Sequence, residues 1–114
     1  MFRLRDLGIL TLEALRAARH GRLFEMEGPA FALVGRSEAD NVALLADAPE
    51  SALMLELKDR PGPLACVMGS PPQAALDNVR RLVVRYSRFR DLGPDAVGAW
   101  SPEEVRARYD SAAV

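Results

Sequence analysis

The longest part of the chain without a helix-breaking residue runs over residues 71–92, and it constrains the fold most. Prolines open it, where a missing amide hydrogen costs a helix nothing, and a Gly-Pro pair closes it. Arg85 and Arg88 lie within about 40° of Arg81 on one face, and we call these three residues the arginine stripe. The apolar residues occupy the opposite arc: Leu76, Val79, Leu82, Val83, Tyr86 and Phe89. The pattern predicts a helix of about 20 residues with its apolar face on a core.

Short apolar runs bounded by turn residues predict strands elsewhere. Five are expected, as two hairpins and one further strand: 22–26 with 31–34, 53–57 with 64–68, and 95–100. Capping hydroxyl groups and later breakers predict three more helices: from Thr11 to before Gly21, from Ser37 to before Pro49, and from Ser101 onward.

The expected element order is α-β-β-α-β-β-α-β-α. A length of 114 residues suits one hydrophobic core, and no repeat or linker divides the chain, so we expect residues 1–114 to form a single domain. The fold class that follows is α+β, a mainly antiparallel sheet with helices packed on one side.

Composition excludes several classes of protein. With 49% hydrophobic and 27% charged residues, the chain can bury a core and is unlike a disordered tail. No apolar run reaches the roughly 18 residues of a membrane span, and the first residues lack a secretion signal, so we expect a cytoplasmic protein with no membrane partner. The one cysteine, Cys66, and the one histidine, His20, make neither a disulfide nor a metal-ligand cluster. We therefore expect no metal.

Two predicted turns carry groups suited to an anion. Gly35-Arg36-Ser37 stands where a strand gives way to a helix, and free amide hydrogens beside a guanidinium group suit one phosphate. Lys58-Asp59-Arg60-Pro61-Gly62-Pro63 is a stiff hairpin turn with two cations. A purely structural interpretation stays open for each turn, because Ser37 can simply cap the helix and Pro-Gly needs no ligand.

Charge is segregated along the chain. Residues 78–90 hold five arginines and no acid, whereas residues 37–57 hold five acids and no base. Guanidinium groups bind phosphates in bidentate fashion, so the segregation favours a local basic patch on a protein whose net charge is −1. Fourteen of the fifteen basic residues are arginine, so a solvated helix face, or one paired with the acidic segment, stays open as the alternative.

No catalytic constellation stands out. His20 has no nucleophile signature beside it, and Cys66 lies in an apolar run, where burial raises the pKa of a thiol and suppresses its reactivity. Gly35 and Gly62 stand alone rather than in a phosphate loop of the Walker or dinucleotide type. We expect a protein that is not an enzyme and needs no cofactor.

Three segments taken together resemble the NFACT-R domain, the proposed RNA-binding module at the C-terminal end of NFACT proteins. That family has Gly-Arg followed by Asn-Asp, then Lys-Asp-x-Pro-Gly-Ser-His-Val, then a helix ending near Tyr-Ser-x-x-Arg. The counterparts here are Gly35-Arg36 with Asn41, the turn from Lys58 to Gly62, and Tyr86-Ser87-Arg88-Phe89-Arg90. The resemblance spans roughly residues 29–100.

The chain departs from the family pattern at three places. Val42 replaces the family's Asp, Pro63-Leu64 replaces Ser-His, and Glu56 replaces the His in the strand before Lys-Asp. With Pro-Gly-Pro in the turn, the sequence is closer to a divergent branch fused to enzymes similar to the 4-thiouridine tRNA sulfurtransferase. By resemblance, that branch would bind or present tRNA without performing the chemistry.

The resemblance implies a small non-catalytic module that binds tRNA or rRNA in ribosome quality control or tRNA modification. Arg36, Lys58 and Arg60 would contact phosphate, Asn41 would hydrogen-bond a base or sugar, and the arginine stripe would extend the basic track. Asp59 would order the turn at Gly62 or accept from a 2′-hydroxyl group. The alternative is an adaptor that docks onto a separate tRNA-modifying or translation enzyme as its protein partner.

Overall fold

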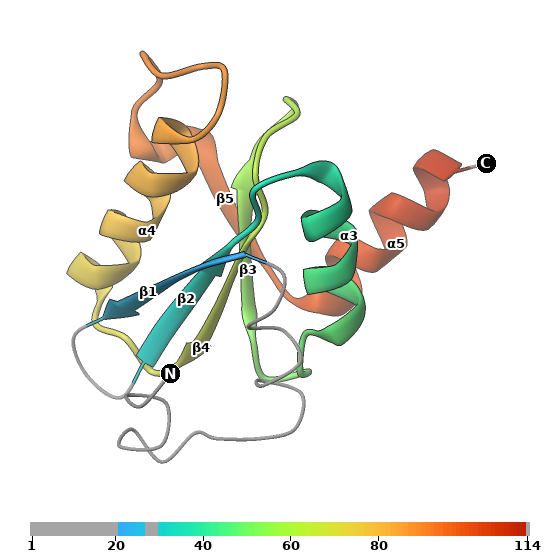
Figure 1. The fold of residues 1–114 in the computed structure, drawn as a ribbon, viewed down its shortest axis with the longest axis horizontal. Helices are drawn as coiled ribbons and strands as arrows, with labels where there is room; N and C mark the ends of the chain where they lie inside the picture. Colours follow the sequence, from blue (N-terminus) through green and yellow to red (C-terminus); the bar gives the residue numbers. More distant parts are fainter. Residues whose placement is uncertain (1–20, 27–29, 114) are drawn as a thin grey trace.

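The computed structural model describes residues 21–26 and 30–113. Within them the chain forms a five-stranded sheet and three α-helices, which carry the labels of Figure 1. In chain order the elements are β1 (Arg22–Met26), β2 (Ala30–Val34), α3 (Glu38–Asp47), β3 (Leu53–Leu57), β4 (Ala65–Gly69), α4 (Gln73–Arg85), the 3-10 turn η1 (Pro94–Ala96), β5 (Val97–Trp100) and α5 (Pro102–Ala113). In this part of the chain no helix is both long and apolar enough to cross a membrane.

The sheet is antiparallel throughout, in the order β1-β2-β4-β3-β5. The predicted hairpins are confirmed, because β1 pairs with β2 and β3 pairs with β4, and the class α+β is confirmed with them. The turn expected at residues 27–29 and the helix expected after Thr11 lie outside the described residues. The central position of β4 follows from its pairing on both sides, with β2 and with β3.

Helices cover both faces of the sheet, and the expectation that they pack on one side is wrong. Figure 1 shows α4 on one side of the sheet and α3 with α5 on the other. Strand β2 is buried along its whole length: Phe31 and Leu33 pack towards α3 and α5, whereas Ala32 and Val34 pack towards α4. A strand buried on both faces reads as a continuous apolar run, and the runs of β2 and β4 are of this kind.

Helix α4 ends at Arg85, earlier than the predicted limit near Leu92. The hydroxyl group of Ser87 donates to the carbonyl of Val84 over 2.6 Å and accepts from the amide of Phe89 over 3.0 Å, and both bonds replace helical ones. Arg88 therefore lies beyond the helix, and the three-residue arginine stripe does not exist as predicted. Tyr86, expected on the core face, is 40% exposed instead.

Local capping signals are confirmed at two helix starts. The hydroxyl group of Ser37 accepts from the amide of Asp40 at the start of α3. At the start of α5, Ser101 and Glu104 each accept from the amide of the other, over 3.2 and 3.1 Å. The backbone hydrogen bond from Ser101 lowers the pKa of the Glu104 carboxyl group.

Cys66 provides a probe of the core. Its side chain on the central strand has no exposed surface, and burial raises the pKa of its thiol to about 12. Since the thiolate is the reactive form, alkylation by iodoacetamide at about pH 8 should be slower in the folded protein than in guanidinium chloride by about three orders of magnitude. Mass spectrometry measures this without ambiguity, because the chain has one cysteine. Equal rates in the two solvents would place Cys66 outside the core.

Candidate functional site

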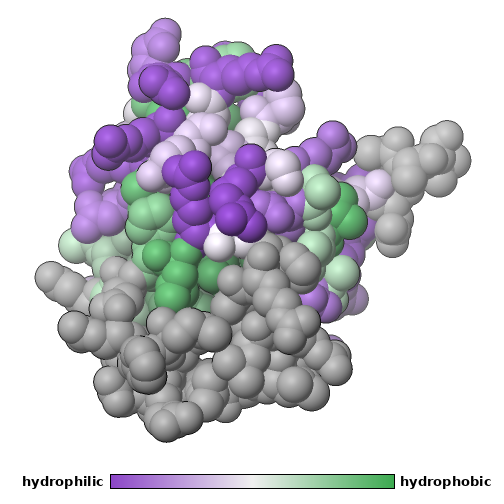
Figure 2. Space-filling model, viewed as in Figure 1, coloured by the Kyte–Doolittle hydropathy of each residue, from purple (hydrophilic) through white to green (hydrophobic). Residues whose placement is uncertain are grey.

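Three segments that are distant in sequence meet at one end of the sheet: 35–41, 58–64 and 86–96 (Figure 1). We call the surface that they form the polar end. Two backbone hydrogen bonds of 2.9 Å tie them together: Gly35 to the carbonyl of Leu64, and Lys58 to the carbonyl of Ala96. Figure 2 shows hydrophilic side chains gathered over this end of the molecule. The sequence motifs at residues 36 and 58–62 are thus brought together by the fold.

Asn41 joins the first turn of α3 to the 58–64 turn. Its side-chain oxygen accepts from the amide of Leu64 over 3.0 Å, and its side-chain nitrogen donates to the carbonyl of Gly62 over 3.2 Å. A side chain at Gly35 would collide with the Asn41 amide, so glycine is needed there for this close approach. With 9% of its surface exposed and its amide engaged at both ends, Asn41 positions the two turns rather than meeting a ligand.

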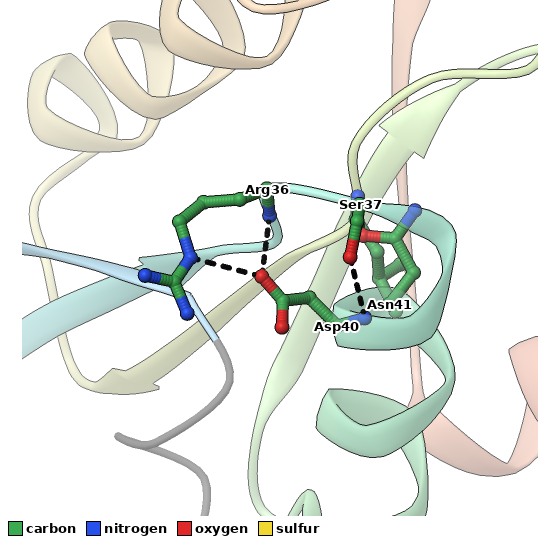
Figure 3. Close-up of polar contacts among 5 residues, drawn as sticks. Arg36, Ser37, Asp40 and Asn41 are labelled. Carbon is green, nitrogen blue, oxygen red and sulfur yellow. Dashed lines mark hydrogen bonds and ion pairs between the residues drawn. The ribbon is translucent and has the colours of Figure 1, made fainter.

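Arg36 is held at the start of α3 by Asp40 (Figure 3). Both its backbone amide and its Nε donate to Asp40 Oδ2, each over 3.0 Å. Asp40 thus reaches back one residue beyond the N-cap Ser37, a variation on the predicted capping box. The side chain of Arg36 stays 52% exposed, but the carboxylate offsets part of its charge.

The two cations of the 58–64 turn are held by uncharged groups. Lys58 Nζ donates to the backbone carbonyl of Asp95 over 3.0 Å, and the Arg60 guanidinium lies 4.9 Å from the centroid of the Phe89 ring. Asp59 has φ 58°, a left-handed conformation that a short polar side chain tolerates, so its backbone shapes the turn. Lys58 and Arg60 are both exposed, and neither takes part in the ion pairs found among the described residues.

A second group of arginines lies on α4 and on the chain that follows it. Arg81, Arg85 and Arg90 line a shallow depression between the last turns of the helix and the chain that follows it, whereas Arg88 does not line it. Arg90 was absent from the residues predicted to bind nucleic acid, although it belongs to the Tyr86–Arg90 segment. Arg90 reaches the depression because the helix ends before it. The side-chain hydrogen bonds of Ser87, which end the helix, would have been needed to predict this.

Carboxylates do not neutralise these arginines. In the part of the chain that the structure describes, three ion pairs are found: Arg36–Asp40, Arg80–Asp77 and Arg108–Glu56. Glu56, from the acidic segment, is thus paired with an arginine of α5. The expected alternative, pairing of the arginine stripe with that segment, is not seen among the described residues.

Titratable groups with shifted pKa lie on the α3 and α5 side of the sheet, away from the polar end. Burial raises the pKa of Glu56 against the opposing effect of Arg108, and burial together with Glu56 raises the pKa of Tyr109 to about 12. Tyr109 donates to Glu56, so the pair is a packed structural contact. Among residues 21–26 and 30–113 no cluster of His, Cys, Asp or Glu could hold a metal ion.

Comparison with known proteins decides the family. The sequence pattern described as the NFACT protein RNA binding domain matches residues 21–109, most of the chain. This chain is an NFACT RNA-binding domain. No curated protein matches it.

A solved structure shares the fold of this NFACT RNA-binding domain. It is the C-terminal part of the fibronectin/fibrinogen-binding protein from Streptococcus suis, with 20% sequence identity and a TM-score of 0.61. The match covers 89% of this chain and 44% of that one, so the domain spans less than half of the structure it resembles.

The departures from the NFACT-R pattern have structural counterparts. Pro63 and Leu64, in place of Ser-His, are buried, and Leu64 supplies the amide and the carbonyl that Asn41 and Gly35 engage. Glu56, in place of a strand histidine, is paired with Arg108 over 2.7 Å. The polar end of this domain therefore relies on lysine and arginine rather than histidine.

Replacing Asn41 tests the link between the turns. Asn41→Ala leaves the buried amide of Leu64 and the carbonyl of Gly62 without partners, so the free energy of unfolding should fall by about 2 kcal/mol. Denaturant titration followed by circular dichroism measures this change. Val42→Ala is the matched control, because Val42 is the next residue of α3 and is 53% exposed; it should cost less than about 0.5 kcal/mol. Equal losses would show that the amide bridge contributes nothing.

Proposed function

We propose that this domain is a non-catalytic module that binds tRNA or rRNA through its polar end, in translation quality control or tRNA modification. The family to which it belongs supports RNA as the partner. The observation that carries the proposal is the gathering of exposed cations from distant segments on one surface, without carboxylate partners for Lys58 and Arg60 in the described structure.

The residues have different roles in this proposal. Arg36, Lys58 and Arg60 contact phosphates of the RNA backbone, since guanidinium and ammonium groups at a surface favour such contacts. Asn41 and Gly62 hold the turn that presents them. The basic surface continues over Arg81 and Arg85 of α4 and over Arg88 and Arg90 of the chain that follows the helix.

The charge balance of the domain directs RNA to one surface. The net charge is −1, so the protein as a whole does not attract a polyanion, and attraction is confined to the basic surface. Binding at such a site depends on a few phosphate contacts, each of which releases counterions. The logarithm of the affinity should therefore fall linearly with the logarithm of the salt concentration, with a slope proportional to the number of those contacts.

The salt dependence of binding tests this directly. With fluorescently labelled tRNA, the logarithm of affinity is measured by anisotropy between about 50 and 200 mM salt. The double variant Lys58→Gln and Arg60→Gln should reduce the slope against the logarithm of salt concentration by about 1.5 to 2, because two phosphate contacts are lost. Weaker binding should accompany the shallower slope.

The matched control lowers the net charge by the same two units elsewhere. The control is Ala46→Glu with Ser51→Glu. Both positions are exposed; Ala46 lies in the last turn of α3 and Ser51 in the turn before β3. The slope of this variant should equal that of the unmodified protein. A slope that falls equally in both double variants would contradict the proposed surface. No binding to tRNA or to rRNA fragments at low salt, with capture of one protein partner after nuclease treatment, would favour the adaptor function instead.

Asp59→Gly separates the two roles suggested for Asp59. Glycine adopts the left-handed φ without strain, so the turn should keep its shape while the carboxylate is removed. If the backbone alone matters, RNA affinity should stay the same or rise by up to about threefold as a negative charge leaves the surface. A loss of about tenfold in the same anisotropy assay would assign the carboxylate to a 2′-hydroxyl group. Circular dichroism checks that the fold is retained.

A further inference from the structure

The depression beside α4 combines three guanidinium groups with an apolar floor. It has a volume of about 240 Å³ and lies between the last turns of α4 and the chain that follows the helix. Its lining residues are Arg81, Val84, Arg85, Arg90, Leu92 and Pro94. We call it the arginine depression.

The cations of the arginine depression face no acid. Arg81 Nη1 donates to the side-chain oxygen of Asn78 over 2.9 Å, which orients the group without neutralising it. The acids nearest in sequence are Asp77, Asp91 and Asp95, and none of them lines the depression. Asp77 is paired with Arg80. In the described part of the chain, Arg81, Arg85 and Arg90 form no ion pair, so the site keeps three positive charges.

The size and the lining together specify a ligand. The volume is below the roughly 300 Å³ at which sites for whole small molecules begin, so the depression holds one group of a larger ligand or a very small one. Guanidinium groups match the oxygens of a phosphate, whereas Val84, Leu92 and Pro94 offer surface to an apolar ring or sugar face. A nucleotide carries both parts on adjacent atoms.

We propose that the arginine depression is a subsite for a single nucleotide, in which Arg81, Arg85 and Arg90 hold the phosphate and the floor packs against its sugar or base. The proposal rests on the RNA-binding function and assigns one nucleotide of the RNA to this place. The side chains that line the floor carry no donor or acceptor, so this subsite accepts any base.

The position of the depression fits an RNA that also reaches the 58–64 turn. The chain after α4 forms a tight turn, closed by the hydrogen bond from the amide of Leu92 to the carbonyl of Phe89. Arg60 stacks on Phe89, whereas Leu92 and its neighbour Arg90 line the depression. One short turn thus connects the nucleotide subsite with the cations of the polar end.

Backbone NMR with adenosine monophosphate, adenosine and inorganic phosphate as separate probes tests the subsite. Adenosine monophosphate should shift the amides of residues 84–85, 90–93 and 95, and should bind at least about tenfold more tightly than either probe that carries one half of it. Equal affinity for inorganic phosphate would overturn the nucleotide assignment, as would shifts spread over all the arginines.

Variants identify the groups that hold the phosphate. Arg90→Gln should weaken binding of adenosine monophosphate by about tenfold, and Arg90→Lys by less, because the charge remains while the bidentate geometry is lost. Ser51→Asp lowers the net charge by the same amount at an exposed position in the turn before β3, and should change the affinity by less than about twofold. Equal effects of Arg90→Gln and Ser51→Asp would overturn the proposal.

Titration with a short RNA separates this proposal from the RNA-binding function. Shifts at residues 58–60 together with 84–85, 90–93 and 95 support both. Shifts at 58–60 without any at the arginine depression would overturn the subsite and leave the RNA-binding function standing. Binding of the mononucleotide at the depression without any binding of RNA at low salt would overturn the RNA-binding function and the assignment of the site to RNA.

Discussion

The amide side chain of Asn41 makes two hydrogen bonds on which the geometry of the polar end depends. It engages the backbone at Gly62 and Leu64, so the helix that follows β2 and the turn that precedes β4 are fixed to each other. A buried amide without partners is costly, so the two turns pack in the arrangement that satisfies it. Gly35 makes room for this contact and donates to Leu64 from the other side. The positions of Arg36 and Arg60 relative to each other follow from this network rather than from any direct contact between them.

Much of the fold could be predicted because its signals are local. Caps at Ser37 and Ser101 and the turn after β3 mark element ends within a few residues. The placement of helices on both faces depends on which helix returns to which side, which is a long-range property, although the unbroken apolar run of β2 already pointed to burial on both faces. The end of α4 was missed because Ser87 ends the helix through its hydroxyl group, and helical periodicity does not report such bonds.

Most residues of the candidate site could be predicted from the sequence, but the hydrogen bonds between them could not. The residues of the two turns were identified from their order and chemistry, and the fold brings them together. The side chain of Asn41 bonds to the backbone, and Asp40 holds Arg36. Both contacts depend on side-chain geometry, which the spacing of residues in the sequence does not predict. The exchange of Arg88 for Arg90 beside α4 follows from the early helix end, so one local error displaced a residue of the basic surface.

The way Lys58 and Arg60 are tethered has a thermodynamic consequence. Long basic side chains lose rotational freedom when they grip a polyanion, and each such loss opposes association by about 0.5 to 1.5 kcal/mol. Here a main-chain carbonyl and an aromatic ring already restrain them in the unliganded fold. The two side chains are therefore ordered when the domain folds rather than when RNA binds. Because neither the carbonyl nor the ring carries a formal charge, the restraint does not weaken the attraction of the two cations for phosphate.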